Sequence, residues 1–301
     1  MLRNTKKVPE KEKKPAISYW QKDKTLCPVC GKGFEREVMH SGSGRMIAGE
    51  LTDELHRLFE PSAKYGTIYP LIYDIGACPN CHAAFFWKDF AISDKASVQA
   101  IYDSEEERRS IVNNVFPYYN LKKERSLYDG CAMYFLALLT YDKVAVSHSP
   151  TMKRAMLSLR LAWLCKDLDT AVPGHNFSFL AESFYRKALF FYQQTLLNET
   201  GRVETIASVS NFGPDMDKNY GYDGVVYLCG LLEYKYGQRD DEQQRFKKLD
   251  EYKRAIARIF GLGKSSKEKP GPLLEHSRNL YDRLSKELAN ANMPDIEDFE
   301  E

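Results

Sequence analysis

Beyond about residue 103, hydrophobic and polar positions alternate with the period of amphipathic helices. Met156, Leu159 and Trp163 recur at three- and four-residue steps, while Arg160 and Lys166 lie among them. Such spacing places the apolar side chains on one stripe of a solvated helix. Gly, Pro, Asp, Asn or Ser residues interrupt the pattern. It predicts helices over Asp103–Val115, Lys123–Tyr141, Pro150–Asp167, Phe177–Glu199, Tyr222–Tyr236, Asp240–Phe260 and Pro272–Ala289.

The loops between most of these segments are short, which favours antiparallel neighbours and a stack of helical hairpins. The best single unit is Val225–Arg254, where Gly230, Gly237 and Phe246 occupy the small, small and aromatic positions of a tetratricopeptide-like hairpin. Glu242 replaces its usual alanine, so the repeat is degenerate. We therefore predict a mainly α protein whose larger part, residues 103–260, is a tetratricopeptide-like α-solenoid or helical-hairpin domain.

Residues 25–102 have a different texture and predict a small, ribbon-like α+β module. Two C-x-x-C pairs are separated by 47 residues. Between them we expect a short helix over Gly49–Phe59, ended by Pro61, and a strand-like run over Thr67–Ala77 that leads into the second pair. The apolar core of so small a module is not sufficient to stabilise it, so the module needs a cross-link such as a bound metal ion.

Charged ends flank these two regions. Residues 1–24 are rich in Lys, Glu and Pro and are predicted to be a disordered basic tail. Residues 261–301 are predicted to hold a linker, a C-terminal helix and an acidic tail.

Composition narrows the class of protein. The 301 residues are 43% hydrophobic and 13% aromatic, enough for a substantial core. Since 43 basic residues nearly balance 42 acidic ones, no strong field attracts nucleic acid or an anionic membrane. The longest apolar run, Cys131–Leu139, is too short to span a membrane. The basic N-terminus lacks the apolar segment of a signal peptide, so we expect a cytoplasmic protein.

The two cysteine pairs carry the clearest chemistry. Cys27, Cys30, Cys78 and Cys81 form two C-x-x-C turns. Two intervening residues let both sulfurs of a turn point at a common centre, and two such turns complete a tetrahedral shell. The pattern predicts one structural zinc ion per chain. The other cysteines, Cys131, Cys165 and Cys229, lie in apolar helical segments and are expected in the core.

Residues beside the pairs are candidates for supporting the metal. Gly31 and Gly33 permit a tight left-handed turn in which backbone N–H groups bond the sulfurs. His82 follows the second pair and is a candidate for the same outer shell, or for a ligand. Zinc with four thiolates carries a charge of −2, which nearby cations would offset in part. The nearest in sequence are Lys24, Lys32 and Lys88.

Other chemistries fit the same residues less well. A redox C-x-x-C opens a helix after a strand, whereas Gly31 and Gly33 start a helix poorly. Cys78 to His82 satisfies the C-x-x-C-H string of haem attachment, a modification of exported proteins. Asp53 and His56 have helical spacing and could serve an open catalytic zinc, but four cysteines leave no open coordination position.

The strings CPVCGKGFE, DELHRLF and IYPLIYDIGACPNCHAAFFW resemble the opening of an uncharacterised bacterial family, a domain of unknown function (DUF2225). The resemblance covers about residues 25–260 and implies two metal-binding knuckles followed by a tetratricopeptide-like helical region. This chain departs from the family at His82, where Gly is usual. The turn must then tolerate a side chain or change its conformation. The resemblance implies no activity.

We therefore hypothesise a zinc-stabilised, non-enzymatic scaffold or adaptor that binds a protein partner through its helices. Alternatives are a nucleic-acid-binding zinc module that uses the basic leader and, with less support, a thiol redox or metal-dependent enzyme. Aromatic residues are numerous enough to line a partner groove, although periodic aromatics mostly pack in cores. They are Tyr118, Tyr119, Tyr185, Phe190, Phe191, Tyr192, Tyr220 and Tyr222.

Overall fold

The computed structural model describes residues 15–206, 209–261 and 269–290. Three two-stranded antiparallel sheets occupy the N-terminal part, and helices follow. The strands are β1 (Ser18–Leu26), β2 (Gly33–Met39), β3 (Ile47–Leu51), β4 (Arg57–Glu60), β5 (Ile75–Ala77) and β6 (Ala84–Phe86). The helices of the described residues are α1 (Lys95–Asp103), α2 (Glu105–Val115), α3 (Leu127–Tyr141), α4 (Pro150–Ala171), α5 (Phe177–Thr200), α6 (Gly221–Tyr236), α7 (Glu242–Phe260) and α8 (Gly271–Asn290). Short 3₁₀ helices span Pro70–Tyr73 (η1), Trp87–Ala91 (η2) and Val146–His148 (η3).

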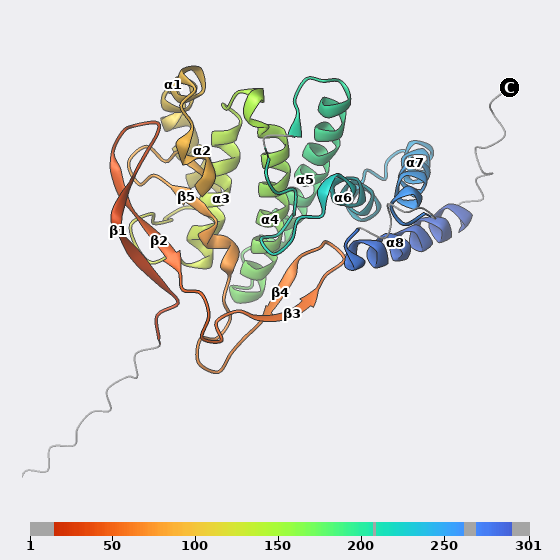
Figure 1. Ribbon diagram of the computed structural model, residues 1–301, viewed down its shortest axis with the longest axis horizontal. Coiled ribbons are helices and arrows are strands. Elements are labelled where there is room, and N and C mark those ends of the chain that lie inside the picture. The colour runs from red at the N-terminus through yellow and green to blue at the C-terminus, as the bar shows by residue number, and fades with distance from the viewer. Residues whose placement is uncertain (1–14, 207–208, 262–268, 291–301) are drawn as a thin grey trace, which may run out of the picture.

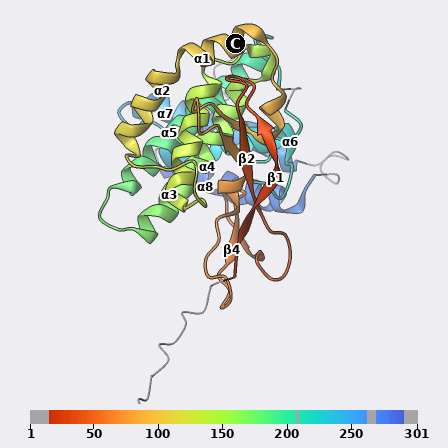
Figure 2. The same cartoon turned by 90° about the vertical axis from the view of Figure 1, so that its left-hand side faces the viewer.

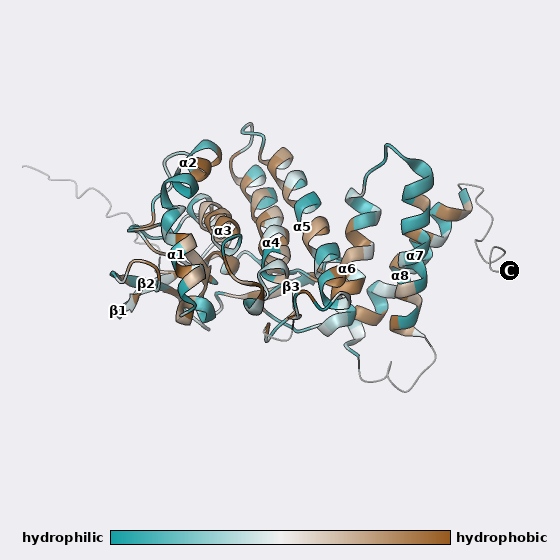
Figure 3. Ribbon diagram, turned by 90° about the horizontal axis from the view of Figure 1, so that it is seen from above, coloured by the Kyte–Doolittle hydropathy of each residue, from teal (hydrophilic) through white to brown (hydrophobic). Residues whose placement is uncertain are grey.

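The helices form a row in which each packs against its neighbours in sequence, from α2 to α8 (Figure 1). Seen from above, brown apolar positions lie between adjacent helices (Figure 3). This arrangement confirms the predicted mainly α fold built from helical hairpins. The unit Val225–Arg254 is one of them, with Gly230 of α6 lying against Tyr252 and Ile256 of α7.

Local signals fix where the helices begin. Ser126 and Asp129 form a reciprocal capping box at the start of α3, four residues after the predicted start. Asp241 caps α7 in the same way as Asp94 caps α1. Helix α1 was not predicted, because it falls in the segment assigned to the cysteine module.

Three predictions for the N-terminal part are wrong. Residues 47–60 form the β3–β4 hairpin rather than a helix, with Leu55 in a left-handed turn between the strands. The run Thr67–Ala77 is mostly the 3₁₀ helix η1 and contributes only the three-residue strand β5. Residues 18–24, assigned to a tail, belong to β1 and pair with β2. In each case the outcome depends on a pairing partner or packing surface that a local pattern does not contain.

The other parts of the predicted division are untested or fall outside the description. Residues 1–14, 262–268 and 291–301 lie outside the described residues, and with them most of the basic tail, the linker and the acidic tail. The C-terminal helix is confirmed as α8. The division at residues 102 and 260 stays a prediction.

The cysteine module and the helices share one hydrophobic core, which extends from Cys27 to Leu284. Helix α3 contacts both η1 and the β5–β6 hairpin. The hydroxyl of Tyr134 donates to the carbonyl of Leu71 in η1 at 2.9 Å, and Thr140 Oγ1 accepts from the N–H of Ala84 in β6 at 3.1 Å. The three other cysteines, Cys131, Cys165 and Cys229, are fully buried in this core, as expected.

A second junction lies at the turn between β3 and β4, beneath the row of helices (Figures 1 and 2). Glu54 is only 6% exposed. Its carboxylate accepts hydrogen bonds from Trp163 of α4 at 2.5 Å, Tyr185 of α5 at 2.8 Å and Lys235 of α6 at 3.0 Å. Asp53 pairs with Lys235 at 2.7 Å and with Arg283 of α8 at 3.0 Å. Asp53 and Glu54, which form the acidic turn between β3 and β4, therefore contact α4, α5, α6 and α8.

Only some of the eight aromatic residues that could line a partner groove are accessible to a partner. Four of the eight are buried, namely Tyr185, Phe191, Tyr192 and Tyr220. Tyr118, Phe190 and Tyr222 are exposed. None of the helices in the described ranges is long and apolar enough for a membrane span.

Candidate metal centre

The sulfur atoms of Cys27, Cys30, Cys78 and Cys81 converge within 4.8 Å of one another. Across the two turns, Cys27 lies 3.6 Å from Cys81, and Cys30 lies 3.7 Å from Cys78. Three of the four cysteines are buried, and Cys30 is half-buried. The structure therefore brings together the full ligand set expected from the sequence, and this set could hold a metal ion.

Both cysteine turns have the same backbone hydrogen bonds. In the first, the Gly31 N–H donates to the Cys27 carbonyl at 2.9 Å, and the Cys27 N–H donates to the Lys32 carbonyl at 3.1 Å. In the second, the N–H of His82 donates to the carbonyl of Cys78 at 2.9 Å, and the N–H of Cys78 to that of Ala83 at 2.9 Å. Each turn leads into a strand, β2 or β6.

The turns share a left-handed residue after the second cysteine. Gly31 has a φ of 70°, as predicted, and His82 has a φ of 57°. His82 therefore keeps the conformation of a glycine position although its side chain disfavours it by about 1 kcal/mol. Its ring meets Tyr119 edge-on at 5.9 Å, and among the described residues it is not part of the group of converging ligand atoms. Gly33 is not left-handed but begins β2, so its predicted role in the turn is wrong.

Hydrogen bonds to sulfur come from within the turns. Backbone N–H groups of Val29 and Cys30 donate toward Cys27, and those of Asn80 and Cys81 toward Cys78. Hydrogen bonds from Cys27, followed by those from Cys81, lower the pKa of the Cys78 thiol. The cluster thus favours a thiolate at Cys78, and thiolate is the form that binds metal.

A buried arginine beside the cluster was not predicted. Arg108 of α2 is 1% exposed and donates to the Cys81 carbonyl at 3.0 Å. Burial lowers its pKa, while the charges of Cys81 and Cys27 act in the opposite direction. Arg108 is therefore a cation able to offset the charge of a metal–thiolate centre. The run EEERR carries no local signal for this role, because the contact depends on how α2 packs. Lys24, Lys32 and Lys88, the cations nearest in sequence, are exposed.

The residues considered for an open catalytic site are held elsewhere. Asp53 pairs with Lys235 and Arg283. Burial acts to raise the pKa of Asp53, but the hydrogen bonds and charges of Lys235 and Arg283 together outweigh burial and the pKa is lowered. His56 bonds Asp215 at 2.5 Å and stacks on Trp163 at 4.0 Å. Both side chains fasten the β3–β4 hairpin to the helices, and neither belongs to the cysteine cluster.

The fold and the site together define a class of protein: a four-cysteine module, suited to a metal ion, fused to a row of helical hairpins. The family model described as "Uncharacterized protein conserved in bacteria (DUF2225)" matches residues 20–284. The chain belongs to this family, as its cysteine strings indicated.

A relative from Borreliella burgdorferi, strain B31, described as "Uncharacterized protein", is 41% identical over 275 residues. The alignment covers 91% of this chain and 98% of the relative. No solved structure matches the chain.

Proposed function

We propose that the four cysteines bind one structural zinc ion per chain, and that the protein is a non-enzymatic scaffold or adaptor. The convergence of four sulfurs carries the first part. Zn–S bonds of about 2.3 Å in a tetrahedron place sulfurs about 3.8 Å apart. The 3.6 and 3.7 Å separations across the turns fit that spacing, and they are far too long for a disulfide bond of about 2.05 Å.

The position of the centre supports a structural role. Cys27 and Cys30 join β1 to β2, and Cys78 and Cys81 join β5 to β6. Zinc would thus bind two hairpins that share no ladder hydrogen bonds with each other. With four thiolates as ligands, it keeps no open position for a substrate. Both turns also lead into strands, whereas a redox C-x-x-C opens a helix.

Metal analysis with thiol titration tests this part. We expect about one zinc per chain and no thiol that reacts with Ellman's reagent in the folded protein. Chelation should make the four ligand thiols reactive and lower the unfolding midpoint, because metal binding and folding are coupled. Cys27→Ser and Cys78→Ser should lose zinc, while the control Cys229→Ala, in the core, should keep it. A folded, metal-free protein with a thiol that titrates near neutral pH would contradict the proposal.

The partner surface that we propose is the outward face of α5. Phe179, Phe190 and Leu197 are 70%, 57% and 65% exposed. Their spacings of 11 and 7 residues place them within about 20° of one another around the helix, along about 27 Å of its length. Arg186, seven residues after Phe179, lies on the same line and pairs with Glu182 at 2.6 Å, so the face also carries charges of both signs. A stripe of this shape suits an amphipathic helix of a partner protein.

The double variant Phe190→Glu/Leu197→Glu tests this surface against Asn113→Glu, which adds charge to an exposed position of α2. Full burial of each apolar side chain contributes about 1.5 kcal/mol or more, so the double variant should weaken binding about 100-fold. A partner protein is first captured with the wild type and with Asn113→Glu and is then purified. We expect the purified partner to bind these two chains but not the double variant. Equal binding by all three chains, or light scattering that shows this face to join two copies of the chain, would refute the partner proposal.

Nucleic-acid binding stays a second prediction. Most of the basic leader on which it depends, residues 1–14, lies outside the described residues. Strongly salt-dependent binding to DNA or RNA would favour it over the scaffold.

A further inference from the structure

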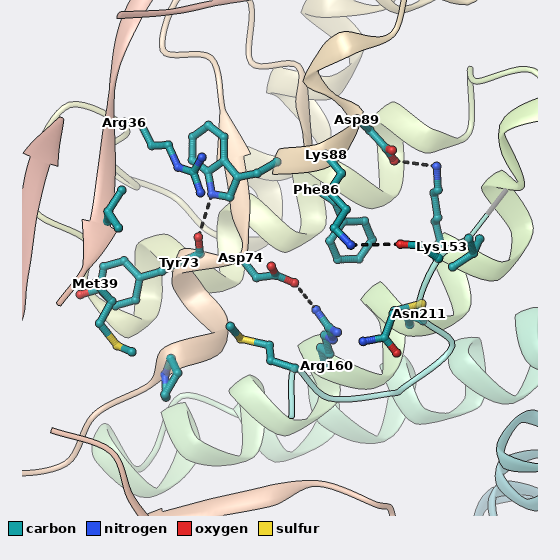
Figure 4. Close-up of a pocket in the computed structure, with 17 residues that line it drawn as sticks. Arg36, Met39, Tyr73, Asp74, Phe86, Lys88, Asp89, Lys153, Arg160 and Asn211 are labelled. Carbon is teal, nitrogen blue, oxygen red and sulfur yellow. Dashed lines mark hydrogen bonds and ion pairs between the residues drawn. The ribbon is translucent and has the colours of Figure 1, made fainter. Parts of the chain in front are cut away.

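A cavity of about 890 Å³ lies between the strands that leave the cysteine turns and helix α4 (Figure 4). One wall comes from Arg36 and Met39 of β2, Tyr73 and Asp74 before β5, and the segment Phe86–Asp89. Helix α4 forms the opposite wall, and residues 209–211 and Met216 lie beside it. The volume is that of a small-molecule site.

The α4 wall is built by one helix face. Lys153, Met156 and Arg160 follow one another at three- and four-residue steps, so all three point to the same side. Lys153 pairs with Asp89 at 2.6 Å, and Arg160 pairs with Asp74 at 2.5 Å. These two ion pairs bridge the two walls and fix their spacing (Figure 4).

Two further cations in the cavity have no carboxylate partner within the described part of the chain. Lys88 donates to the neutral hydroxyl of Ser210 at 3.0 Å. The guanidinium of Arg36 lies 4.2 Å from the centre of the Trp87 ring, and its Nε is buried without a hydrogen-bond partner. The four cations and two carboxylates of the lining leave a net charge of about +2.

The side chain of Arg36 is positioned to bind an anion. Stacking on Trp87 fixes the plane of its guanidinium, and that ring is fixed in turn because its Nε1 donates to the Tyr73 carbonyl at 2.8 Å. Burial lowers the pKa of Arg36, and nearby Asp74 opposes this shift only in part. The buried Nε of Arg36 is out of reach of a ligand, but its two Nη atoms are not among the buried unpartnered atoms. An oxyanion in the cavity would accept from these Nη atoms, and guanidinium N–H groups match phosphate oxygens.

The rest of the lining suits a planar apolar group. Tyr73 and Phe86 offer rings, and Met39, Met156 and Met216 offer thioether side chains. Methionine sulfur makes favourable contacts with aromatic rings and adapts to irregular shapes. The cavity thus combines cations with aromatic and sulfur-containing side chains, and the guanidinium of Arg160 lies 5.4 Å from the centre of the Phe86 ring.

From this arrangement we infer that the cavity is a binding site for a phosphate monoester carried on a planar ring system, of the nucleoside monophosphate class. A phosphate monoester carries a charge of about −1.5 to −2 at pH 7, which balances the charge of the empty lining. Arg36 and Lys88 bind the phosphate, and the ring lies among Tyr73, Phe86 and the methionines. This site is separate from the α5 surface and from the metal centre.

Fluorine NMR of the full, zinc-loaded chain labelled with 5-fluorotryptophan tests the inference. Trp87 reports on the cavity, while Trp20 and Trp163, the other tryptophans of the chain, serve as internal references. The probes are AMP, GMP, CMP and UMP, with adenosine and inorganic phosphate as partial ligands. We expect at least one monophosphate to shift the Trp87 resonance at sub-millimolar concentration, with adenosine and phosphate each at least tenfold weaker.

Arg36→Gln should weaken the binding of that monophosphate about tenfold or more, because it removes a charge-assisted contact. The matched control is Arg45→Gln, since Arg45 stacks on Tyr65 at 4.6 Å but does not line the cavity. Lys88→Gln, at an exposed position, gives a second test should Arg36→Gln unfold the chain. The inference is overturned if no monophosphate moves Trp87, if phosphate alone binds equally well, or if the Arg36 or Lys88 variant binds like the wild type in a folded protein. Tighter binding of single-stranded DNA than of any monophosphate would also overturn it.

Discussion

Glu54→Gln should detach the β3–β4 turn from the helices at little change in volume. In the wild type, one carboxylate oxygen accepts from Trp163 and Tyr185 and the other accepts from Lys235. Glutamine has a single carbonyl oxygen, so its NH₂ group must face either the Lys235 ammonium or the Trp163 N–H. Both are donors only, and either orientation places donor against donor.

The magnitude follows from these contacts. Loss of a hydrogen bond to a charged group lowers the free energy of unfolding by about 1.5–3 kcal/mol, and an unsatisfied buried donor lowers it further. Lys235 keeps Asp53 as a partner at 2.7 Å, which limits the loss. We expect the free energy of unfolding to fall by about 3 kcal/mol. In urea, with a slope of about 3 kcal/mol/M, the midpoint should move down by about 1 M.

The matched control is Glu182→Gln, whose ion pair with Arg186 is exposed on α5. Exposed pairs of this kind contribute about 0.5 kcal/mol or less. Circular dichroism of the zinc-loaded chains in urea measures both variants at pH 7. If Glu54→Gln shifts the midpoint no more than Glu182→Gln does, then the acidic turn does not hold the hairpin on the helices.

Two other variants probe buried positions. Burial raises the pKa of Asp167 to about 6, partly opposed by His56. The folded state therefore binds the carboxyl proton more tightly than the unfolded chain does, and the protein loses stability as the pH rises through 6. Asp167→Asn, which resembles the protonated form, should therefore add about 2–3 kcal/mol to the unfolding free energy at pH 8 and little at pH 4; an equal gain at both pH values would contradict this cause. Gly130→Ala would place a methyl group 2.4 Å from Ile72 Cγ2, where α3 meets η1, and overpacking should lower the unfolding free energy by about 1–3 kcal/mol. Gly271→Ala, at an open position of α8, is its control, and equal stability of the two would show that Ile72 moves aside without cost.

The sequence by itself determined the features that depend on short-range geometry. A C-x-x-C turn aims its two sulfurs through the backbone of a few residues, so Cys27, Cys30, Cys78 and Cys81 could be grouped before any fold was known. Helical periodicity likewise repeats within a single segment, and the seven segments predicted from it match helices α2 to α8 to within four residues at each end.

Only the tertiary structure decided the features that need a distant partner. Strands β1, β3 and β4 depend on their pairing, since the local pattern of Gly49–Phe59 predicted a helix. Arg108 reaches the cysteine cluster because α2 packs beside the second turn. Glu54 meets α4, α5 and α6 at positions more than 100 residues away, and Arg36 faces α4 across the cavity. Burial, ion pairing and cavity shape are sums over segments that lie far apart in the chain, and no local pattern contains those sums.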